Sequence, residues 1–253
     1  MLCDSKWDVA YAHCPFLGHT GYANHAREFF TALNTKIPVR IRNFTHTNDI
    51  SYLTQEQKDM CVHQTWIGPP HEIGTPFNPS LKDKLINIIL METNHMYFYD
   101  KYQGPKIAFN VWESTLQPEP FFSKLKEFDQ VWVPTEWQRQ CTINQGISED
   151  KVFVVPEGVD LKRFYPVNHK PNDKFQFMIF GRWDYRKYTR ETVQAFIEEF
   201  GKDEPVELIL SADNPYPVDS YNSTEERLEK YGLQDPRIKI LHFPSDKEYT
   251  KYL

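Results

Sequence analysis

The chain has 253 residues, 40% of them hydrophobic and 15% aromatic, which suffices for the core of one large or two ordinary domains and argues against a disordered chain. Its formal net charge of -6 argues against general nucleic-acid binding, because that function needs a basic face. No apolar run of about 18 residues and no signal-peptide pattern is present, so no membrane span is expected. The four scattered cysteines lack metal-type spacing and indicate reduced thiols in a cytoplasmic protein.

Strand-like and helix-like segments alternate along the first part of the chain. Its predicted strands lie at 8–13, 37–44, 84–91, 106–112 and 151–160, with a further strand at the start of the segment 129–147. A predicted helix at 23–33 has one apolar face. In 129–147, Thr135 and Gln138 predict a capping box that starts a second helix, and Gly146 is expected to end it. This alternation predicts an α/β fold with a mostly parallel sheet.

A polar segment with two prolines at 165–174 has the composition of a linker, and the alternation restarts after it. The expected order there is a strand at 175–180, a helix at about 190–200, a strand at 206–212, a helix from Ser223 boxed by Glu226, and a strand at 238–244. We therefore predict two domains, 1–168 and 169–253.

The second predicted domain has only three strands, whereas a doubly wound nucleotide-binding domain commonly has five or six. Ser245 and Glu248 form another capping-box pattern close to the end of the sequence. We therefore expect the second domain to be incomplete, as in a fragment of a longer protein. The alternative is a short three-stranded layer that packs on the first domain.

A cluster of cations follows the strand at 175–180. Four of them fall within nine positions: Arg182, Arg186, Lys187 and Arg190. In open α/β sheets ligands bind at the carboxyl edge of the strands, and a helix N-terminus there favours an anion. Gly181 permits a sharp turn or a close approach, and Arg182 and Lys187 can contact phosphate oxygens. The alternative is a solvated basic face that pairs with nearby acidic residues of the same helix, namely Glu191, Glu198 and Glu199.

The segment "FGRWDYRKYTRETVQAFIEEF" resembles the second domain of retaining glycosyltransferases of family 4, which have the GT-B fold. "VPEGVDLKRFYP" at 155–166 resembles the turn that leaves the first domain of that family, and "HTGYANHAREFFTAL" at 19–33 resembles its first glycine loop and helix. "IAFNVWESTLQP" at 107–118, with "VWVPTEWQRQ", resembles mannosyltransferase-like members. The resemblance covers nearly the whole chain, with the motifs in the family's order.

The resemblance implies a fold of two Rossmann-like doubly wound units and the transfer of a sugar from a nucleotide-sugar donor, with retention, to a hydroxyl acceptor on a glycan, lipid or protein. Arg182 and Lys187 match the arginine and lysine that hold the donor diphosphate in that family. No metal and no other cofactor is implied, and a UDP- or GDP-sugar would be the substrate. The E-x7-E motif, which contacts the donor in that family, does not appear before the sequence ends.

Candidate residues of the first domain surround the expected acceptor side. Gly21 is expected to let the donor phosphate or the acceptor approach closely, with Tyr22 beside it. Where family members often carry a histidine at a strand end, this sequence has Trp112 and Glu113, and Glu113 can bind hydroxyls or accept the acceptor's proton. Further candidates are His13, His19 and His95. By analogy of position, the nucleotide base is expected near 241–246, which makes His242 and Phe243 donor-binding candidates.

Two other function classes fit parts of the sequence. A truncated, non-catalytic module that binds a glycan or a partner protein is compatible with the missing E-x7-E motif. A dinucleotide-dependent oxidoreductase is disfavoured, because no G-x-G-x-x-G follows a predicted strand with an acidic residue about 20 positions later. Calorimetry with UDP- and GDP-sugars distinguishes the transferase from the binding module.

Overall fold

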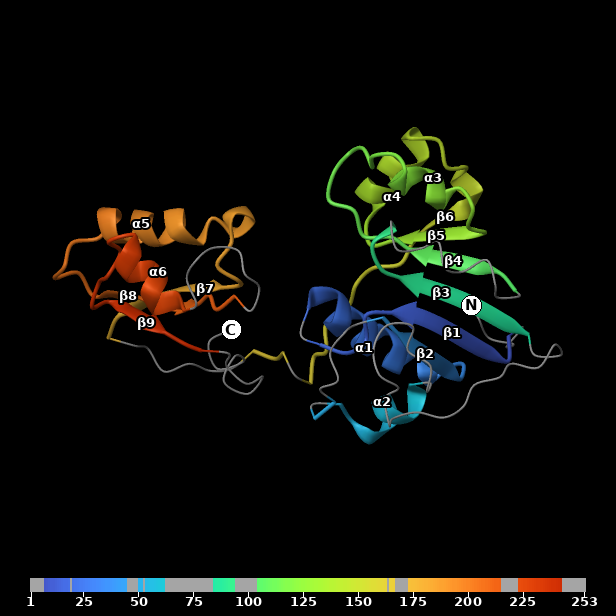
Figure 1. Ribbon diagram of the computed structural model, residues 1–253, viewed down its shortest axis with the longest axis horizontal. Helices are drawn as coiled ribbons and strands as arrows, with labels where there is room; N and C mark the ends of the chain where they lie inside the picture. Colours follow the sequence, from blue (N-terminus) through green and yellow to red (C-terminus); the bar gives the residue numbers. More distant parts are fainter. Residues whose placement is uncertain are drawn as a thin grey trace. The chain divides into compact units, whose positions relative to one another are not determined.

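The computed structural model describes residues 7–18, 20–44, 50–51, 53–61, 84–93, 104–162, 164–166, 173–214 and 223–242. The chain forms two compact units, Met1–Val159 and Asp160–Leu253. This division lies before the proline-containing segment 165–174, whereas the sequence predicts a division within that segment. Both units contain parallel strands and helices (Figure 1), as the predicted α/β fold requires. The candidates His19, His95 and Phe243, and the capping-box pattern near the end of the sequence, lie outside the described residues.

The first unit is built on a six-stranded parallel sheet of order β2-β1-β3-β4-β5-β6. Its strands are β1 (Val9–Cys14), β2 (Val39–Asn43), β3 (Leu85–Leu90), β4 (Lys106–Phe109), β5 (Gln130–Val133) and β6 (Val152–Val154). Its helices are α1 (Gly21–Asn34), α2 (Gln55–Met60), α3 (Phe121–Leu125) and α4 (Glu136–Asn144), with a 3-10 turn, η2 (Glu149–Lys151), before β6. All strand pairs are parallel, so their carboxyl ends meet at one edge.

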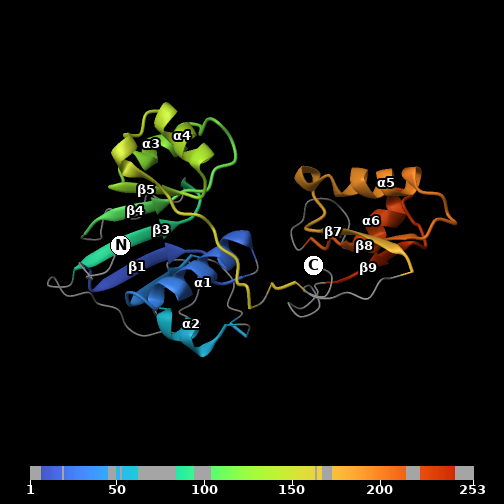
Figure 2. The ribbon, with the colours of Figure 1, turned by 180° about the vertical axis from the view of Figure 1, so that it is seen from behind.

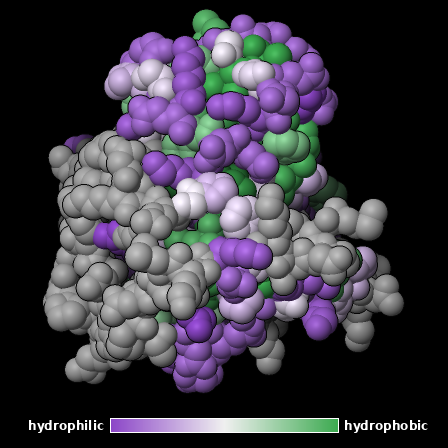
Figure 3. All heavy atoms as spheres, turned by 90° about the vertical axis from the view of Figure 1, so that its right-hand side faces the viewer, coloured by the Kyte–Doolittle hydropathy of each residue, from purple (hydrophilic) through white to green (hydrophobic). Residues whose placement is uncertain are grey.

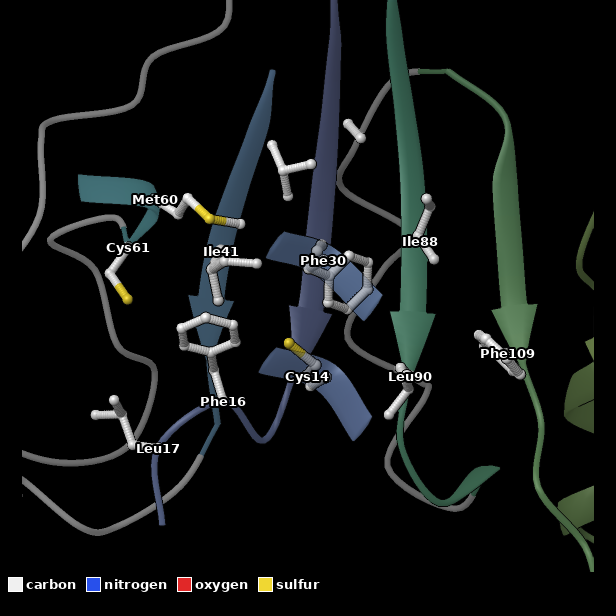
Figure 4. Packing of buried hydrophobic residues seen from close by; sticks show 14 of the residues in the cluster. Cys14, Phe16, Leu17, Phe30, Ile41, Met60, Cys61, Ile88, Leu90 and Phe109 are labelled. Carbon is white, nitrogen blue, oxygen red and sulfur yellow. The ribbon is translucent and has the colours of Figure 1, made fainter. Parts of the chain in front are cut away.

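Helices cover both faces of this sheet, which explains why β1 is buried along its whole length. Alternate residues of β1 pack with Phe30 of α1 and with Ile41 of β2 (Figure 4), and α2 closes the same cluster with Met60. On the opposite face, Phe122 and Leu125 of α3 pack against β3, β4 and β5. Figures 1 and 2 show α1 and α2 on one side of the sheet and α3 and α4 on the other. The surface that Figure 3 presents is mostly hydrophilic where residues are described, as expected for a core enclosed between layers.

The second unit contains a three-stranded parallel sheet of order β7-β8-β9. Its elements are β7 (Phe175–Phe180), the 3-10 turn η3 (Tyr185–Lys187), α5 (Thr189–Glu199), β8 (Val206–Ser211), α6 (Thr224–Lys230) and β9 (Ile238–Ile240). Val193 and Phe196 of α5 and Leu228 of α6 share one cluster with Leu208 and Leu210 of β8, so both helices pack on one face of the sheet. Val193, Phe196, Ile197 and Phe200 recur at helical spacing, so the face of α5 that they share is the one that packs on the sheet.

Several element boundaries differ from the predicted ones for identifiable reasons. The strand predicted at 106–112 ends at Phe109, because the carbonyl of the next residue, Asn110, accepts a bond from Gln138 Nε2 (2.8 Å) and leaves the ladder. The same bond explains why the capping box at α4 is only half formed: Thr135 accepts from the Gln138 N–H, but the Gln138 side chain turns into the core. The first helix starts at Gly21 rather than Ala23, because Thr20 caps it.

Candidate functional site

The loop between β1 and α1 is held by two buried polar side chains that sequence reasoning did not identify. Asn43 Oδ1, at the end of β2, accepts from the N–H groups of Phe16 (2.9 Å) and Leu17 (3.0 Å). Arg27 of α1, only 8% exposed, donates from Nη1 to the carbonyls of Phe16 and Gly18, both at 2.8 Å. Loop amides buried without partners would be costly, so these bonds fix the path of the chain into α1.

Gly21 is the first residue of α1 and is exposed. A Cβ built on it would meet nothing within 4 Å, and its φ angle does not require glycine. Thr20 Oγ1 accepts from the Ala23 N–H (3.2 Å), whereas the N–H groups of Gly21 and Tyr22 have no acceptor among the described residues. The start of α1 therefore presents open space and donor groups, as an anion or hydroxyl ligand needs.

Tyr22 lies among carboxylates at the carboxyl edge of the first sheet. Burial, and after it the charges of Glu92, Glu113 and Glu157, raises the pKa of its phenol to about 12. These glutamates follow three different strands, β3, β4 and β6, so the parallel topology gathers them. The structure thus brings together Tyr22 and Glu113, two of the predicted residues, and adds Glu92 and Glu157, which sequence reasoning missed although each follows a strand of the sheet.

His25, one turn after Tyr22 on α1, pairs with Glu157 through Nδ1 and Oε1 at 2.9 Å. Its side chain is 12% exposed and contacts the Phe109 ring edge-on, with centroids 4.8 Å apart. Burial lowers the pKa of His25, and the charge of Glu157 opposes that change. The pair ties the segment after β6 to α1. The helical spacing of Tyr22 and His25 was the signal that could have identified it.

The segment after β4, which carries Trp112 and Glu113, is held in place by a network of buried amides. Gln117 donates from Nε2 to Thr93 Oγ1 (2.6 Å), and its backbone N–H donates to Gln145 Oε1 (2.8 Å). The indole N–H of Trp112 lies 2.9 Å from Ser114 Oγ and 3.0 Å from the Leu116 carbonyl. Trp112 is half-buried and its indole bonds to groups of its own loop, while Glu113 is exposed on the surface of that loop.

His13 does not belong to this group. It lies in β1 with no exposed surface, edge-on to Tyr11 (centroids 4.4 Å apart) and stacked with Phe44 (6.1 Å). Burial, together with the charge of Arg42, lowers the pKa of His13 well below its ordinary value. The expected acceptor-side role is therefore wrong for this structure, because a side chain without accessible surface cannot contact an acceptor.

In the second unit, the predicted cations lie at the carboxyl end of β7. The Gly181 N–H donates to the Ser211 carbonyl (3.0 Å), and the residue has a φ of 142°, a region that L side chains rarely adopt. A Cβ built at Gly181 would lie 3.9 Å from Lys187 Cε, so the lysine side chain folds back over the glycine. The structure thus brings the Lys187 side chain to Gly181, the residue that directly precedes Arg182 in the sequence. The Arg182 side chain is 45% exposed.

Asp184 organises this turn. Its Oδ1 accepts from the Lys187 N–H (2.9 Å), and its Oδ2 lies 3.6 Å from Arg182 Nη2. Arg186 and Lys187 lie in the 3-10 segment η3, which Tyr188 alone separates from α5, and Arg190 lies in the first turn of α5. Within the described residues, the first three N–H groups of α5 donate no hydrogen bond: Thr189, Arg190 and Glu191.

His242, after β9, is held by carboxylates on both ring nitrogens. Nδ1 lies 2.9 Å from Asp213 Oδ2, after β8, and Nε2 lies 2.7 Å from Glu225 Oε1, at the start of α6. The bonds to Asp213 and then to Glu225 raise the pKa of His242 above its ordinary value. The His242 ring therefore links three elements of the second sheet's carboxyl edge. Because both nitrogens are engaged, a donor contact through them requires one of these bonds to open.

Among the described residues, no group of three or more His, Cys, Asp or Glu side chains is arranged to hold a metal ion, and no helix is long and apolar enough to cross a membrane. The described cysteines, Cys14, Cys61 and Cys141, form no disulfides.

Comparisons with known proteins place the fold. No family model matches the chain. One subunit of the phosphatidylinositol N-acetylglucosaminyltransferase of Arabidopsis thaliana is 29% identical over 119 residues, which is 46% of this chain and only 26% of the length of that protein. Among solved structures, HepE of Anabaena in complex with UDP has a TM-score of 0.60 at 14% identity, covering 94% of this chain and 70% of HepE. The sucrose-phosphate synthase of Thermosynechococcus elongatus has a TM-score of 0.63 at 15% identity, covering 97% and 73% of the two chains.

Proposed function

We propose that this chain, whose two Rossmann-like units have the GT-B fold of these glycosyltransferases, transfers a sugar from a nucleotide-sugar donor to a hydroxyl acceptor. One observation carries the proposal: the Lys187 side chain lies over Gly181 at the end of β7, in the same turn as Arg182. That arrangement provides cations at the sheet edge where open α/β folds bind ligands. HepE has been solved with UDP and with UDP-glucose, and the donor proposed here is of that chemical class.

The donor diphosphate is assigned to the second unit. Arg182 offers a planar fork of donors, Lys187 a point charge, and α5 the uncapped N–H groups and positive end of its dipole. When the bond between the anomeric carbon and the diphosphate breaks, negative charge grows on the leaving oxygen. Cations already placed beside that oxygen stabilise the transition state more than the ground state. Because protein groups supply this charge, the proposal requires no divalent ion or other cofactor.

The reacting hydroxyl of the acceptor is assigned to the carboxylates of the first unit, whose edge has the opposite electrostatic character. The carboxylates around Tyr22 accept hydrogen bonds from hydroxyl groups, whereas they repel a diphosphate. As the bond to the donor breaks, the acceptor oxygen bonds to the anomeric carbon and loses its proton. The exposed carboxylate of Glu113, carried on a loop fixed by buried amides, is the proposed proton acceptor. Retention of the anomeric configuration is part of the proposal, and in a single step it requires the acceptor oxygen to attack from the face that the diphosphate leaves.

The test is titration calorimetry of the chain with UDP- and GDP-sugars, followed by a transfer and hydrolysis assay. Arg182→Ala and Lys187→Ala are expected to lower turnover by about 10²–10³, the range for removing one preorganised charge-stabilising group. Lys202→Ala removes an exposed cation elsewhere in the same unit and serves as the control. Near-normal turnover in both variants would exclude the assigned role. Binding of a sugar nucleotide without transfer or hydrolysis would indicate a non-catalytic module instead.

A further inference from the structure

Two tyrosines expose their rings on either side of Lys187 in the sequence, Tyr185 in η3 and Tyr188 between η3 and α5. Tyr185 is 83% exposed and Tyr188 is 54% exposed. Their ring centroids lie 5.7 Å apart with a 36° angle between the planes, so they form one broad aromatic surface. Trp183, in the same segment, is by contrast 5% exposed and stacks on Tyr231 in the core. Burial of apolar surface therefore accounts for Trp183 but not for the two tyrosines.

The turn that displays these rings is firmly anchored. The Trp183 N–H donates to the Ala212 carbonyl (2.8 Å), and Asn214 Nδ2 donates to the Trp183 carbonyl (2.8 Å). The Tyr188 N–H donates to the Tyr185 carbonyl (3.2 Å), and the Tyr188 carbonyl accepts from both the N–H (2.9 Å) and the hydroxyl (2.8 Å) of Thr192. The two rings are thus presented by fixed backbone, which limits the entropy lost when a ligand binds.

Tyr188 also occupies an unfavourable backbone conformation. Its φ of 52° and ψ of 30° lie in the left-handed region, and it is the single non-glycine residue with positive φ in the described part of the chain. This conformation costs an L-residue about 1–2 kcal/mol, which glycine would avoid. An exposed aromatic side chain kept at a strained position indicates that the ring has a role outside the protein core.

We propose that Tyr185 and Tyr188 form a platform on which a saccharide ring of the acceptor stacks. This inference rests on the proposed transfer reaction, in which the acceptor oxygen attacks the carbon bonded to the diphosphate. Tyr185 and Tyr188 flank Lys187 in sequence, so a ring on the platform lies next to the proposed phosphate site. The apolar face of a pyranose packs on an aromatic face, and the phenol groups meet its hydroxyls. Two rings inclined by 36° do not form the parallel slot that would sandwich a flat nucleobase.

The experiment measures saccharide and donor binding separately. Saturation-transfer NMR is run with millimolar methyl α-D-glucopyranoside, methyl α-D-mannopyranoside and N-acetylglucosamine in the presence of UDP, and calorimetry measures the Kd for UDP-glucose and GDP-mannose. Tyr185→Ala and Tyr188→Gly are compared with Tyr165→Ala, which removes an exposed ring elsewhere in the same unit. Tyr188→Gly keeps the turn foldable, because glycine accepts the left-handed backbone.

We expect at least one of the three saccharides to bind the wild-type chain, and each platform variant to weaken that binding by about tenfold, the effect of losing one aromatic contact. Donor Kd and the Tyr165→Ala variant should be unchanged. The inference is overturned if no saccharide binds, if both platform variants bind it normally, or if they weaken donor binding instead. Saccharide binding that depends on the tyrosines in a chain that binds no sugar nucleotide would retain the platform and refute the donor assignment alone.

Discussion

The methylene chain of Lys187 lies over Gly181, with the lysine Cε 3.9 Å from the position of a glycine Cβ. The contact joins the end of β7 to the last residue of η3, six positions later, and places an ammonium group at the carboxyl edge of the second sheet. The long side chain of Lys187 thus packs against the backbone of a residue that has no side chain of its own. The proposed phosphate site depends on this contact. If Lys187 were an ordinary surface charge, it would have no need to lie against Gly181.

Gly181→Ala should lower both stability and turnover. The φ of 142° is strained for alanine, so a loss of about 1–3 kcal/mol in the free energy of unfolding is expected. A backbone shift that relieves this strain would move the turn that carries Lys187, so kcat should also fall. Gly232→Ala is the control, because Gly232 also has a positive φ (66°) but follows α6, outside the turn that carries Arg182 and Lys187. Urea unfolding should show a loss in both variants, and only Gly181→Ala should lose turnover. Equal turnover in the two would contradict the role of the contact.

Gly21→Ala should leave stability unchanged or raise it while lowering activity, whereas Gly181→Ala should lower both. The added Cβ meets no protein atom and joins a helix, so the free energy of unfolding should stay the same or rise by about 0.4–1 kcal/mol. If a substrate approaches this position, kcat/KM should fall at the same time. Gly158→Ala, also exposed and with an unobstructed Cβ, should leave kcat/KM intact. An active, more stable Gly21→Ala variant would show that Gly21 is an ordinary turn residue.

The bond acceptor Asn43 should be important for stability despite lying outside any motif. Asn43→Ala leaves the buried N–H groups of Phe16 and Leu17 without an acceptor, which should cost about 2–4 kcal/mol of unfolding free energy. Asn144→Ala, which removes an exposed side-chain bond to Gln140, should cost less than about 0.5 kcal/mol. Chemical denaturation of both variants measures the difference. A small loss in Asn43→Ala would mean that the loop finds other partners.

The contribution of His242 to stability should fall as the pH rises. Its pKa is raised in the folded chain above the ordinary value of 6.5, so the stabilising charge is fully present below that pH and is lost as the pH passes through the folded pKa. The difference in unfolding free energy between wild type and His242→Ala should therefore shrink toward alkaline pH and with added salt. NMR titration of the His242 ring, with Glu225→Gln as comparison, measures the pKa directly. A pKa at or below 6.5 would contradict the two-carboxylate contact.

His25 should respond to pH with the opposite sign. Burial lowers its pKa, so the unfolded chain binds more protons than the folded one below the ordinary value of 6.5. The first unit should therefore lose stability as the pH falls below that value, and His25→Phe should reduce this loss. Thermal unfolding at several pH values between about 5 and 8 tests it. An acid transition unchanged in His25→Phe would assign the loss to other groups.

Part of the site was predictable because its signals are local. Gly181, Arg182 and Lys187 follow a strand directly, and Gly21 stands at the start of an amphipathic helix. Their roles in donor binding and catalysis remain predictions. Gln138 shows the limit of local reasoning: its spacing from Thr135 predicts a capping box, but a buried carbonyl 28 residues away in sequence, that of Asn110, takes its side chain. A local sequence pattern cannot show that a hydrogen-bond partner far along the chain will take the side chain instead.

The sequence by itself determined most of the alternation of strands and helices and the apolar faces of α1 and α5, because hydrophobic periodicity reflects which side of an element is buried. It did not predict the short helices α2 and α3. Only the tertiary structure decided which side chains meet. Glu92, Glu113 and Glu157 converge on Tyr22 because β1, β3, β4, β5 and β6 lie side by side in parallel, which brings their carboxyl ends to one edge. Strand order is set by non-local pairing and packing, and no spacing along the chain records it.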